Sequence, residues 1–225
     1  MKALHKLLNV ILFVGFSFSL FSQYAPPGTV RLKPSETGVK HATFIDETEV
    51  TVQYWLDFLH WISVKYGPES AEYKAMLPDS AIGLWQNPSD WRHPQYRNYP
   101  MVCISYEQAV AYCKWRSDRV NEGLSLNKKK KYDYTVSYSL PTETDFIEAY
   151  KQQKIKTDNK NLTFVHWSKK GKIKGIADNA HEFTAEKIVV TGENAGTLLF
   201  QSYQGANAMT GFRCVAEITN NQISK

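Results

Sequence analysis

The segment from residue 100 to residue 116 constrains the fold of this chain more than any other. Residues 100–104 (PMVCI) form a short apolar run with the composition of a β-strand, and Ser105 is of a type that caps helices. A helix is expected from Glu107, because apolar and aromatic residues then recur at helical spacing, at Ala109, Tyr112 and Cys113. The sequence therefore predicts a strand that leads directly into a capped helix with an aromatic face.

The rest of the chain alternates between short helix and strand signals. Apolar residues in 51–66 recur every three or four positions, which predicts a second helix, and a short third helix is expected at 145–150 after a turn at 141–144. Residues 67–100 carry several prolines and little periodicity, which indicates an ordered irregular stretch. Strands are expected at 43–49, 134–140, 163–167, 188–191, 197–203 and 212–218. Two or three helices against small antiparallel sheets, with much irregular structure, define an α+β fold.

The amino-terminal residues predict export. Lys2, His5 and Lys6 precede an apolar run at 7–21, which suits the core of a signal peptide but is short for a helix that spans a membrane. We therefore expect a signal peptide at 1–22; an uncleaved anchor is the alternative. No cysteine ends the run, so a lipid-modified amino terminus is not expected.

The remaining length fits one domain. We expect an extension at 23–42, the domain at 43–219 and a tail at 220–225.

The charge of the chain is modest. The formal net charge is +5, and part of it belongs to one run, Lys128, Lys129, Lys130 and Lys131. This run lies between predicted elements and is interpreted as a solvated loop, so no nucleic-acid partner is expected.

The chain has three cysteines, Cys103, Cys113 and Cys214. In an exported protein an odd count predicts one disulfide and one spare thiol, but counting leaves the pairing open. A bridge between Cys103 and Cys113 is disfavoured, because a strand end followed by a helix holds their Cα atoms further apart than about 7 Å.

Five motifs in chain order resemble those of the formylglycine-generating-enzyme, or sulfatase-modifying factor, superfamily. They lie at 49–58 (EVT, then Y and F), 99–115 (YPMV to YCKW), 140–146 (LPTETDF), 178–184 (DNAHEFT) and 211–214 (GFRC). The resemblance implies the family's irregular fold, which is related to C-type lectins. It implies structural roles for Glu49, Thr51, Trp115, Pro141, Glu143, Gly211 and Arg213. It also implies a disulfide between Cys113 and Cys214, which leaves Cys103 as a small buried residue.

One departure from the family bears on activity. Catalytic members carry two further cysteines upstream of the closing motif, and this chain has none between Cys113 and Cys214. Since thiolate chemistry needs thiols, the resemblance implies a non-catalytic protein. A divergent formylglycine-generating or iron-dependent enzyme remains an alternative, which His93, His166 and His181 gathered around one cavity would favour.

The resemblance also implies a candidate calcium site. In catalytic relatives the region of the fourth motif binds calcium, which corresponds here to Asp178, Ala180 and Glu182. Carbonyl and carboxylate oxygens suit this ion. However, Gly175 stands where a side-chain ligand would be expected, so a plain capped turn is the alternative. No other cofactor is expected.

A narrower resemblance concerns the role of the protein. The second motif and the lysine-bearing insertion after it are similar to domains in gliding-motility and type IX secretion lipoproteins of Bacteroidetes. This implies a structural part in an assembly of the periplasm or outer-membrane-associated envelope. Its partners would be envelope proteins, through which it would associate with the membrane, and the insertion would be a candidate docking surface. The alternative is a lectin-like module that binds glycan or peptide through exposed Trp85, Trp91, Trp167 and Tyr203.

Overall fold

The computed structural model of the protein describes residues 25–33, 43–82, 90–127, 132–153, 171–176, 179–193 and 197–220. Within these ranges the chain forms four α-helices, three short 3₁₀ helices and two four-stranded sheets. The α+β class is therefore confirmed, with one helix more than expected. None of the helices in this part of the chain is long and apolar enough to cross a membrane.

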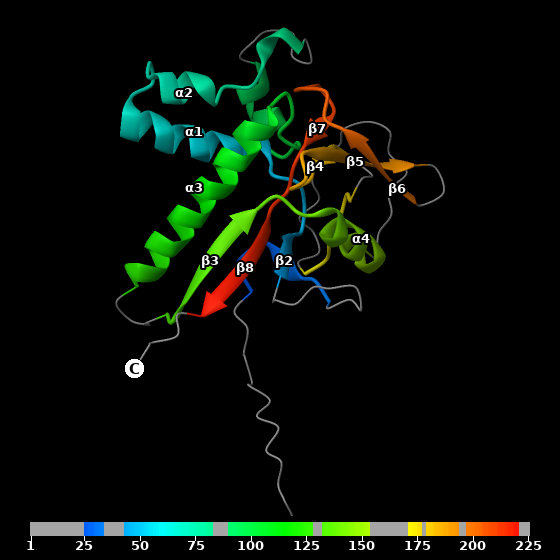
Figure 1. Ribbon diagram of the computed structural model, residues 1–225. Helices are drawn as coiled ribbons and strands as arrows, with labels where there is room; N and C mark the ends of the chain where they lie inside the picture. The colour runs from blue at the N-terminus through cyan, green and yellow to red at the C-terminus, as the bar shows by residue number, and fades with distance from the viewer. Residues whose placement is uncertain are drawn as a thin grey trace, which may run out of the picture.

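The first sheet brings both halves of the chain together. Its order is β1 (Thr29–Arg31), β2 (Thr43–Asp46), β8 (Val215–Asn220) and β3 (Tyr134–Ser139), and every pair is antiparallel. The strand β8 lies between β2 and β3 (Figure 1). The sheet is therefore complete only when β8 is in place between β2 and β3.

The second sheet is smaller and mixed. Its order is β6 (Thr197–Ser202), β5 (Ile188–Glu193), β4 (His181–Phe183) and β7 (Thr210–Gly211). The β6–β5 and β5–β4 pairs are antiparallel, whereas β4 and β7 are parallel. The strand β6 consequently forms one edge of this sheet and β7 the other.

The helices begin at side chains that satisfy their free N–H groups. The helix α1 (Val52–Tyr66) is capped by Thr51, and α2 (Ala71–Ala75) by Ser70. The helices α3 (Tyr106–Ser125) and α4 (Glu143–Gln152) each begin with a capping box, formed by Ser105 with Gln108 and by Thr142 with Asp145. The 3₁₀ helices are η1 (Ser80–Ile82), η2 (Asp90–Arg92) and η3 (Pro94–Tyr96).

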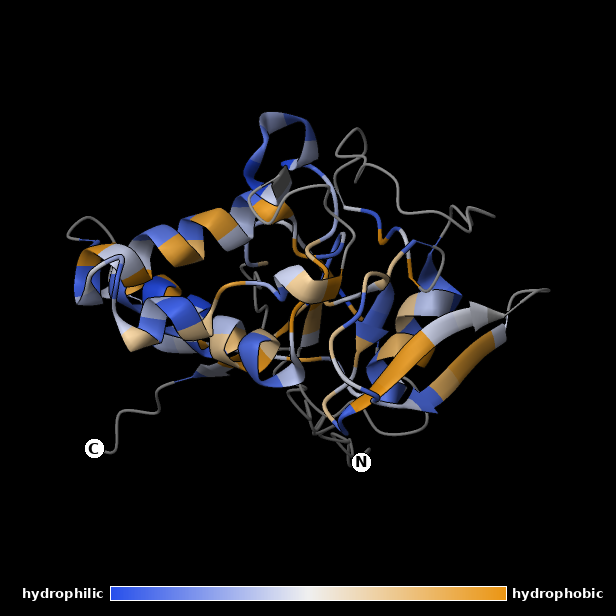
Figure 2. Ribbon diagram, turned by 90° about the horizontal axis from the view of Figure 1, so that it is seen from above, coloured by the Kyte–Doolittle hydropathy of each residue, from blue (hydrophilic) through white to orange (hydrophobic). Residues whose placement is uncertain are grey.

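The first sheet separates two parts of the hydrophobic core. On β2, Phe44 packs into the larger cluster with α1 and α3, whereas Ile45 packs into a second cluster with Phe146 of α4. Figure 1 shows α1, α2 and α3 on one side and α4 with the second sheet on the other. Figure 2 shows hydrophobic and hydrophilic residues alternating along these helices. Burial on both faces fixes the register of β2.

The side chains of α3 cover the outer edge of β3. Asn121 Oδ1 accepts from Val136 N at 2.9 Å, and Asn121 Nδ2 donates to Val136 O at 2.8 Å. One helical turn earlier, Ser117 Oγ accepts from Tyr138 N at 2.7 Å. The helix therefore supplies the hydrogen bonds that a further strand would supply, and this edge of the first sheet is closed.

One strand prediction is wrong. Residues 100–104 do not form a strand: Pro100 makes a single bridge with Thr51, and Cys103 has a left-handed φ of 62°. The segment is nevertheless buried, and Gly211 lies so close to it that an added Cβ would be 2.6 Å from Met101 O. The strand expected at 163–167 lies outside the described residues. The short strands β1 and β4 were not predicted.

Candidate functional site

The centre of the protein holds a buried arginine that joins four segments. Arg213 is fully buried, and its guanidinium donates to both carboxylate oxygens of Glu182, from Nε at 2.6 Å and from Nη2 at 2.9 Å. The same guanidinium donates to the carbonyl oxygens of Asp46 at 3.2 Å and Lys174 at 3.0 Å. A guanidinium with this set of partners satisfies a buried charge and ties β2, β4, the 171–176 segment and the 212–214 segment together.

A second buried carboxylate, Glu49, lies beside this pair. Its Oε2 is 3.9 Å from Arg213 Nη2, and its Oε1 accepts from Ala180 N at 3.4 Å. Burial raises the pKa of Glu49, and the charge of Arg213 acts in the opposite direction. Gly175 faces this carboxylate with φ of 68°, and an added Cβ would be 3.1 Å from both oxygens of Glu49. The space beside Gly175 is therefore filled by Glu49.

Of the residues of the candidate calcium site, Glu182 already has a buried partner, and calcium binding stays a prediction. Both carboxylate oxygens of Glu182 accept from Arg213, so an ion there would have to displace a buried positive charge. The amide of Ala180 points to Glu49, and Asp178 lies outside the described residues. Nowhere in the described ranges do three or more His, Cys, Asp or Glu residues lie together so that they could hold a metal.

A small pocket opens on the other side of Glu49. Asp46 Oδ2 accepts from Arg116 Nη1 at 2.7 Å and from Cys214 N at 2.9 Å, and the Arg116 guanidinium lies 4.2 Å from the centre of the Tyr138 ring. The pocket is lined by Pro27, Gly28, Asp46, Thr48, Glu49, Val50, Tyr54 and Arg116. Its volume of about 270 Å³ includes open solvent, which leaves less room than ligand pockets of about 300–1,000 Å³ provide.

The three cysteines are all buried. The sulfurs of Cys113 and Cys214 are 3.4 Å apart, which is contact but longer than the roughly 2.05 Å of a disulfide bond. The predicted bridge therefore stays a prediction, for two residues that the fold brings together. Cys103 is buried as expected, and burial, with a smaller effect of Asp79, raises the pKa of its thiol to about 11.

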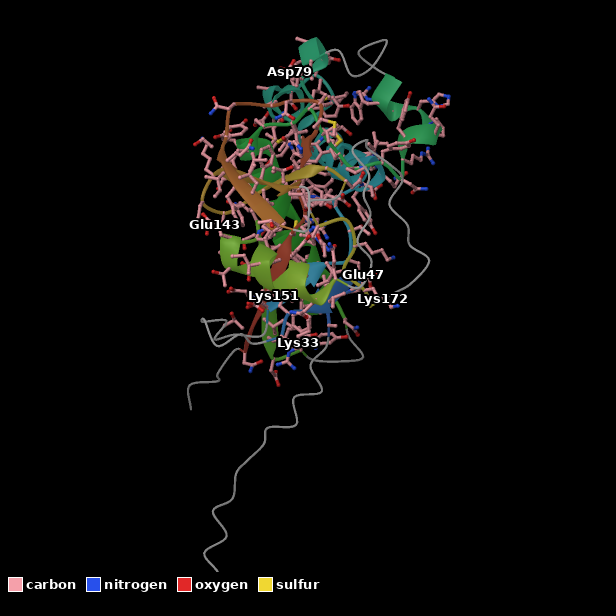
Figure 3. All side chains as sticks on the ribbon, turned by 90° about the vertical axis from the view of Figure 1, so that its right-hand side faces the viewer. Lys33, Glu47, Asp79, Glu143, Lys151 and Lys172 are labelled. Carbon is pink, nitrogen blue, oxygen red and sulfur yellow. The ribbon has the colours of Figure 1, made fainter. Side chains whose placement is uncertain are left out.

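The other motif residues make contacts within the fold. The Trp115 ring packs against Phe58 and Tyr112, the Pro141 carbonyl accepts from Ala185 N, and Glu143 N donates to Glu186. In Figure 3, Glu143 at the start of α4 and Glu47 after β2 lie on opposite sides of the view. These motif residues therefore have structural contacts of their own, apart from the buried centre in which Glu49, Glu182 and Arg213 meet.

Of the residues expected to bind glycan or peptide, the structure describes two. Trp91 is only 3% exposed and packs into the larger core cluster, so the expectation of an exposed ring is wrong for this residue. Tyr203 is partly exposed, and its hydroxyl accepts from Tyr106 N at 3.3 Å. Trp85, Trp167, Lys128, Lys129, Lys130 and Lys131 lie outside the described residues.

Tyr203 belongs to a surface cluster that the sequence did not reveal. Its ring centre is 6.3 Å from that of Tyr106, and Lys187 Nζ lies 5.8 Å and 5.3 Å from the two rings. The same ammonium is 2.7 Å from Glu107 Oε1. Lys187 has a left-handed φ of 59° in the β4–β5 turn, a conformation that costs energy for a residue other than glycine. We call Tyr106, Glu107, Lys187 and Tyr203 the tyrosine platform.

Two of the three histidines of the enzyme hypothesis lie within the described residues. The exposed His93 caps η3 by accepting from Gln95 N through Nδ1, whereas His181 is on β4, where burial lowers its pKa. The third histidine of the enzyme hypothesis, His166, lies outside the described residues.

Comparisons with a family profile, curated proteins and solved structures show what the chain is similar to. The family profile described as the sulfatase-modifying factor enzyme 1-like domain matches residues 16–186, which is more than half of the chain. The chain belongs to this family. It is also similar to a solved structure titled Treponema denticola variable protein 1, with 17% sequence identity and a TM-score of 0.39 over 78% of this chain and 84% of that one. No curated protein matches the chain.

Membership of the sulfatase-modifying factor family confirms the resemblance seen in the five motifs, at the level of the family. The family contains both catalytic and non-catalytic members. Family membership therefore does not distinguish a catalytic from a non-catalytic protein, and the side chains of this chain have to be considered.

Proposed function

We propose that this member of the sulfatase-modifying factor family is a non-catalytic component of the bacterial cell envelope that acts by binding or scaffolding. The observation that supports it is the state of the cysteines. The whole chain has three, and all are buried. Two of them contact each other, and the third has a pKa near 11. A thiol that attacks a substrate or binds a metal must be accessible, and none of these three is.

The finer part of the proposal rests on the sequence. The apolar amino-terminal run supports export, and the second motif with its insertion supports a role near gliding motility or type IX secretion. In such a compartment the contact between Cys113 and Cys214 would become a disulfide. The partner would then be another envelope protein, and the domain would be held at the membrane through it.

Affinity purification tests the scaffold role. The tagged protein is recovered from detergent-solubilised envelopes of its native host, with an untagged strain as control, and associated proteins are identified by mass spectrometry. Stoichiometric recovery of secretion or motility proteins is expected. Recovery of the protein alone, soluble and monomeric, would contradict the proposal.

Thiol counting tests the redox part separately. After export, denaturation without reductant and alkylation, mass spectrometry should find one modified cysteine per chain, and Cys103→Ala should leave none. Three modified cysteines in the exported protein would show that Cys113 and Cys214 do not form the bridge.

A second candidate function, glycan binding, is favoured by the tyrosine platform. Two partly exposed rings tilted by 46° stand beside a lysine and a carboxylate, and such groups can stack on and hydrogen-bond to a sugar. Titration with envelope glycans should then show binding that Lys187→Ala weakens. The matched control is Lys151→Ala on α4, which is paired with Glu148 away from the platform. Equal binding by both variants would exclude the platform as the site.

A further inference from the structure

The strand β6 leaves one edge of the second sheet open. It pairs with β5 over six residues, from Glu193 opposite Thr197 to Ile188 opposite Ser202. In the part of the chain that the structure describes, no hydrogen bond reaches the backbone of β6 other than those of this pair. Figures 1 and 2 show the β5–β6 hairpin at the margin of the molecule. Every second residue of β6 therefore presents its N–H and C=O groups outward.

This open edge contrasts with that of the first sheet. There, Asn121 and Ser117 of α3 bond the outward backbone groups of β3 and prevent further pairing. Proteins commonly protect free edges with charged residues, proline or a covering helix. The sequence of β6, TLLFQS, has neither charge nor proline. The fold thus closes the β3 edge of the first sheet, whereas the β6 edge of the second sheet can still pair.

The β6 strand is complementary to itself when two copies run antiparallel. Leu198 and Phe200 pack on the second core cluster, whereas Leu199 is on the opposite face and is 38% exposed. A two-fold axis at Leu199 places each Leu198 opposite Phe200 of the other copy, on the core side. It places the two Leu199 side chains opposite each other, and Thr197 opposite Gln201. Apolar residues meet apolar residues, polar residues meet polar ones, and no like charges are brought together.

We propose that the protein forms a two-fold symmetric dimer by antiparallel pairing of β6 with β6 of a second copy. The pairing joins two four-stranded sheets into one continuous sheet. Assembly stops at two copies, because the other edge strand of the second sheet, β7, has only two residues and both are buried. The proposal is independent of the proposed function, since it needs no envelope partner.

Association measurements with charge variants test the dimer. A contact between two six-residue strands is small, so the wild-type protein should dimerise reversibly at high micromolar concentration in sedimentation equilibrium. Leu199→Lys brings two ammonium groups together and should weaken dimerisation roughly tenfold or more. Leu199→Glu should act equally, and an equimolar mixture of the two variants should restore association. The control is Leu126→Lys, at a 70% exposed position in the turn that follows α3, which should dimerise like the wild type.

Cross-linking tests the register. Two Leu199→Cys chains should form a disulfide-linked dimer under mild oxidation, because directly opposite residues have Cα atoms about 4.5–5.5 Å apart. In Ser202→Cys chains the two thiols are about 20 Å apart in this register and should not cross-link. The proposal is overturned if the protein is monomeric at all concentrations, if Leu199→Lys dimerises normally, or if the mixture of Lys and Glu variants stays monomeric.

Discussion

Replacement of Asn121 by alanine tests whether α3 closes the edge of β3. The Asn121 side chain makes three hydrogen bonds, to Val136 N, to Val136 O and to the Ser117 carbonyl one turn earlier in its own helix. Val136 itself is only 1% exposed. Asn121→Ala removes all three bonds and leaves the N–H and C=O of a buried strand residue without their partner.

The expected loss follows from these contacts. A buried backbone group left unsatisfied costs about 1–3 kcal/mol, and here there are two. Asn121 is partly exposed, so water can replace some of what is lost, and alanine regains about 0.5 kcal/mol through its higher helix propensity. The net decrease in the free energy of unfolding should be about 2–4 kcal/mol. Since single domains are stable by about 5–15 kcal/mol, the variant should still fold.

Urea denaturation followed by tryptophan fluorescence measures this loss. Trp55 and Trp91 are buried and report on the larger core cluster. The control is Asp118→Ala, an exposed position three residues earlier on α3, which should change stability by less than about 0.5 kcal/mol. If Asn121→Ala is no more destabilising than this control, at unchanged dependence on urea, the edge does not depend on the asparagine and the reasoning is wrong.

Three other predictions concern the buried centre. Glu182→Gln should lower the free energy of unfolding by about 3–5 kcal/mol, because it leaves Arg213 buried without its bidentate partner. A smaller loss in urea denaturation would indicate that other groups stabilise the buried guanidinium. The raised pKa of Glu49 means that the folded state binds a proton more tightly than the unfolded chain, so its contribution to stability falls as pH rises from 4.5 through the raised value. Glu49→Gln should remove that part of the pH dependence, and identical profiles for both proteins would contradict the assignment. Gly211→Ala should destabilise the protein by several kcal/mol or prevent folding, because the added Cβ would be 2.6 Å from Met101 O. If the variant unfolds at the same temperature as the wild type, this backbone contact can open to admit the methyl group.

The three longer helices, α1, α3 and α4, were predictable because their signals are local, whereas the five-residue α2 was not predicted. Thr51, Ser105 and Thr142 precede helical periodicity in the sequence, and each is a cap in the structure. The strands β1 and β4 have three residues each, too few to show alternation, and they exist only because distant segments pair with them. Residues 100–104 have the composition of a strand, but the left-handed Cys103 and the close approach of β7 replace sheet pairing there.

The candidate site was predictable only in part. The motifs indicated that Glu49 and Arg213 are structural, and the structure buries both, but Glu182 as the partner of Arg213 joins residues 31 positions apart and has no local signal. The same holds for the tyrosine platform, in which Tyr106 and Tyr203 are 97 positions apart. Trp91 was misjudged because aromatic residues in an irregular stretch look alike whether they pack inward or outward.

The position of β8 in the middle of the first sheet determines the order in which the protein can fold. A nascent chain emerges with β2 and β3 long before β8, yet these two strands have no contact in the sheet except through it. Arg213 and Cys214, which complete the buried centre, are also made late. The β1–β2 pair and the α3–β3 pair can therefore form early, but they are joined into one sheet only after β8 has been synthesised and inserted between them.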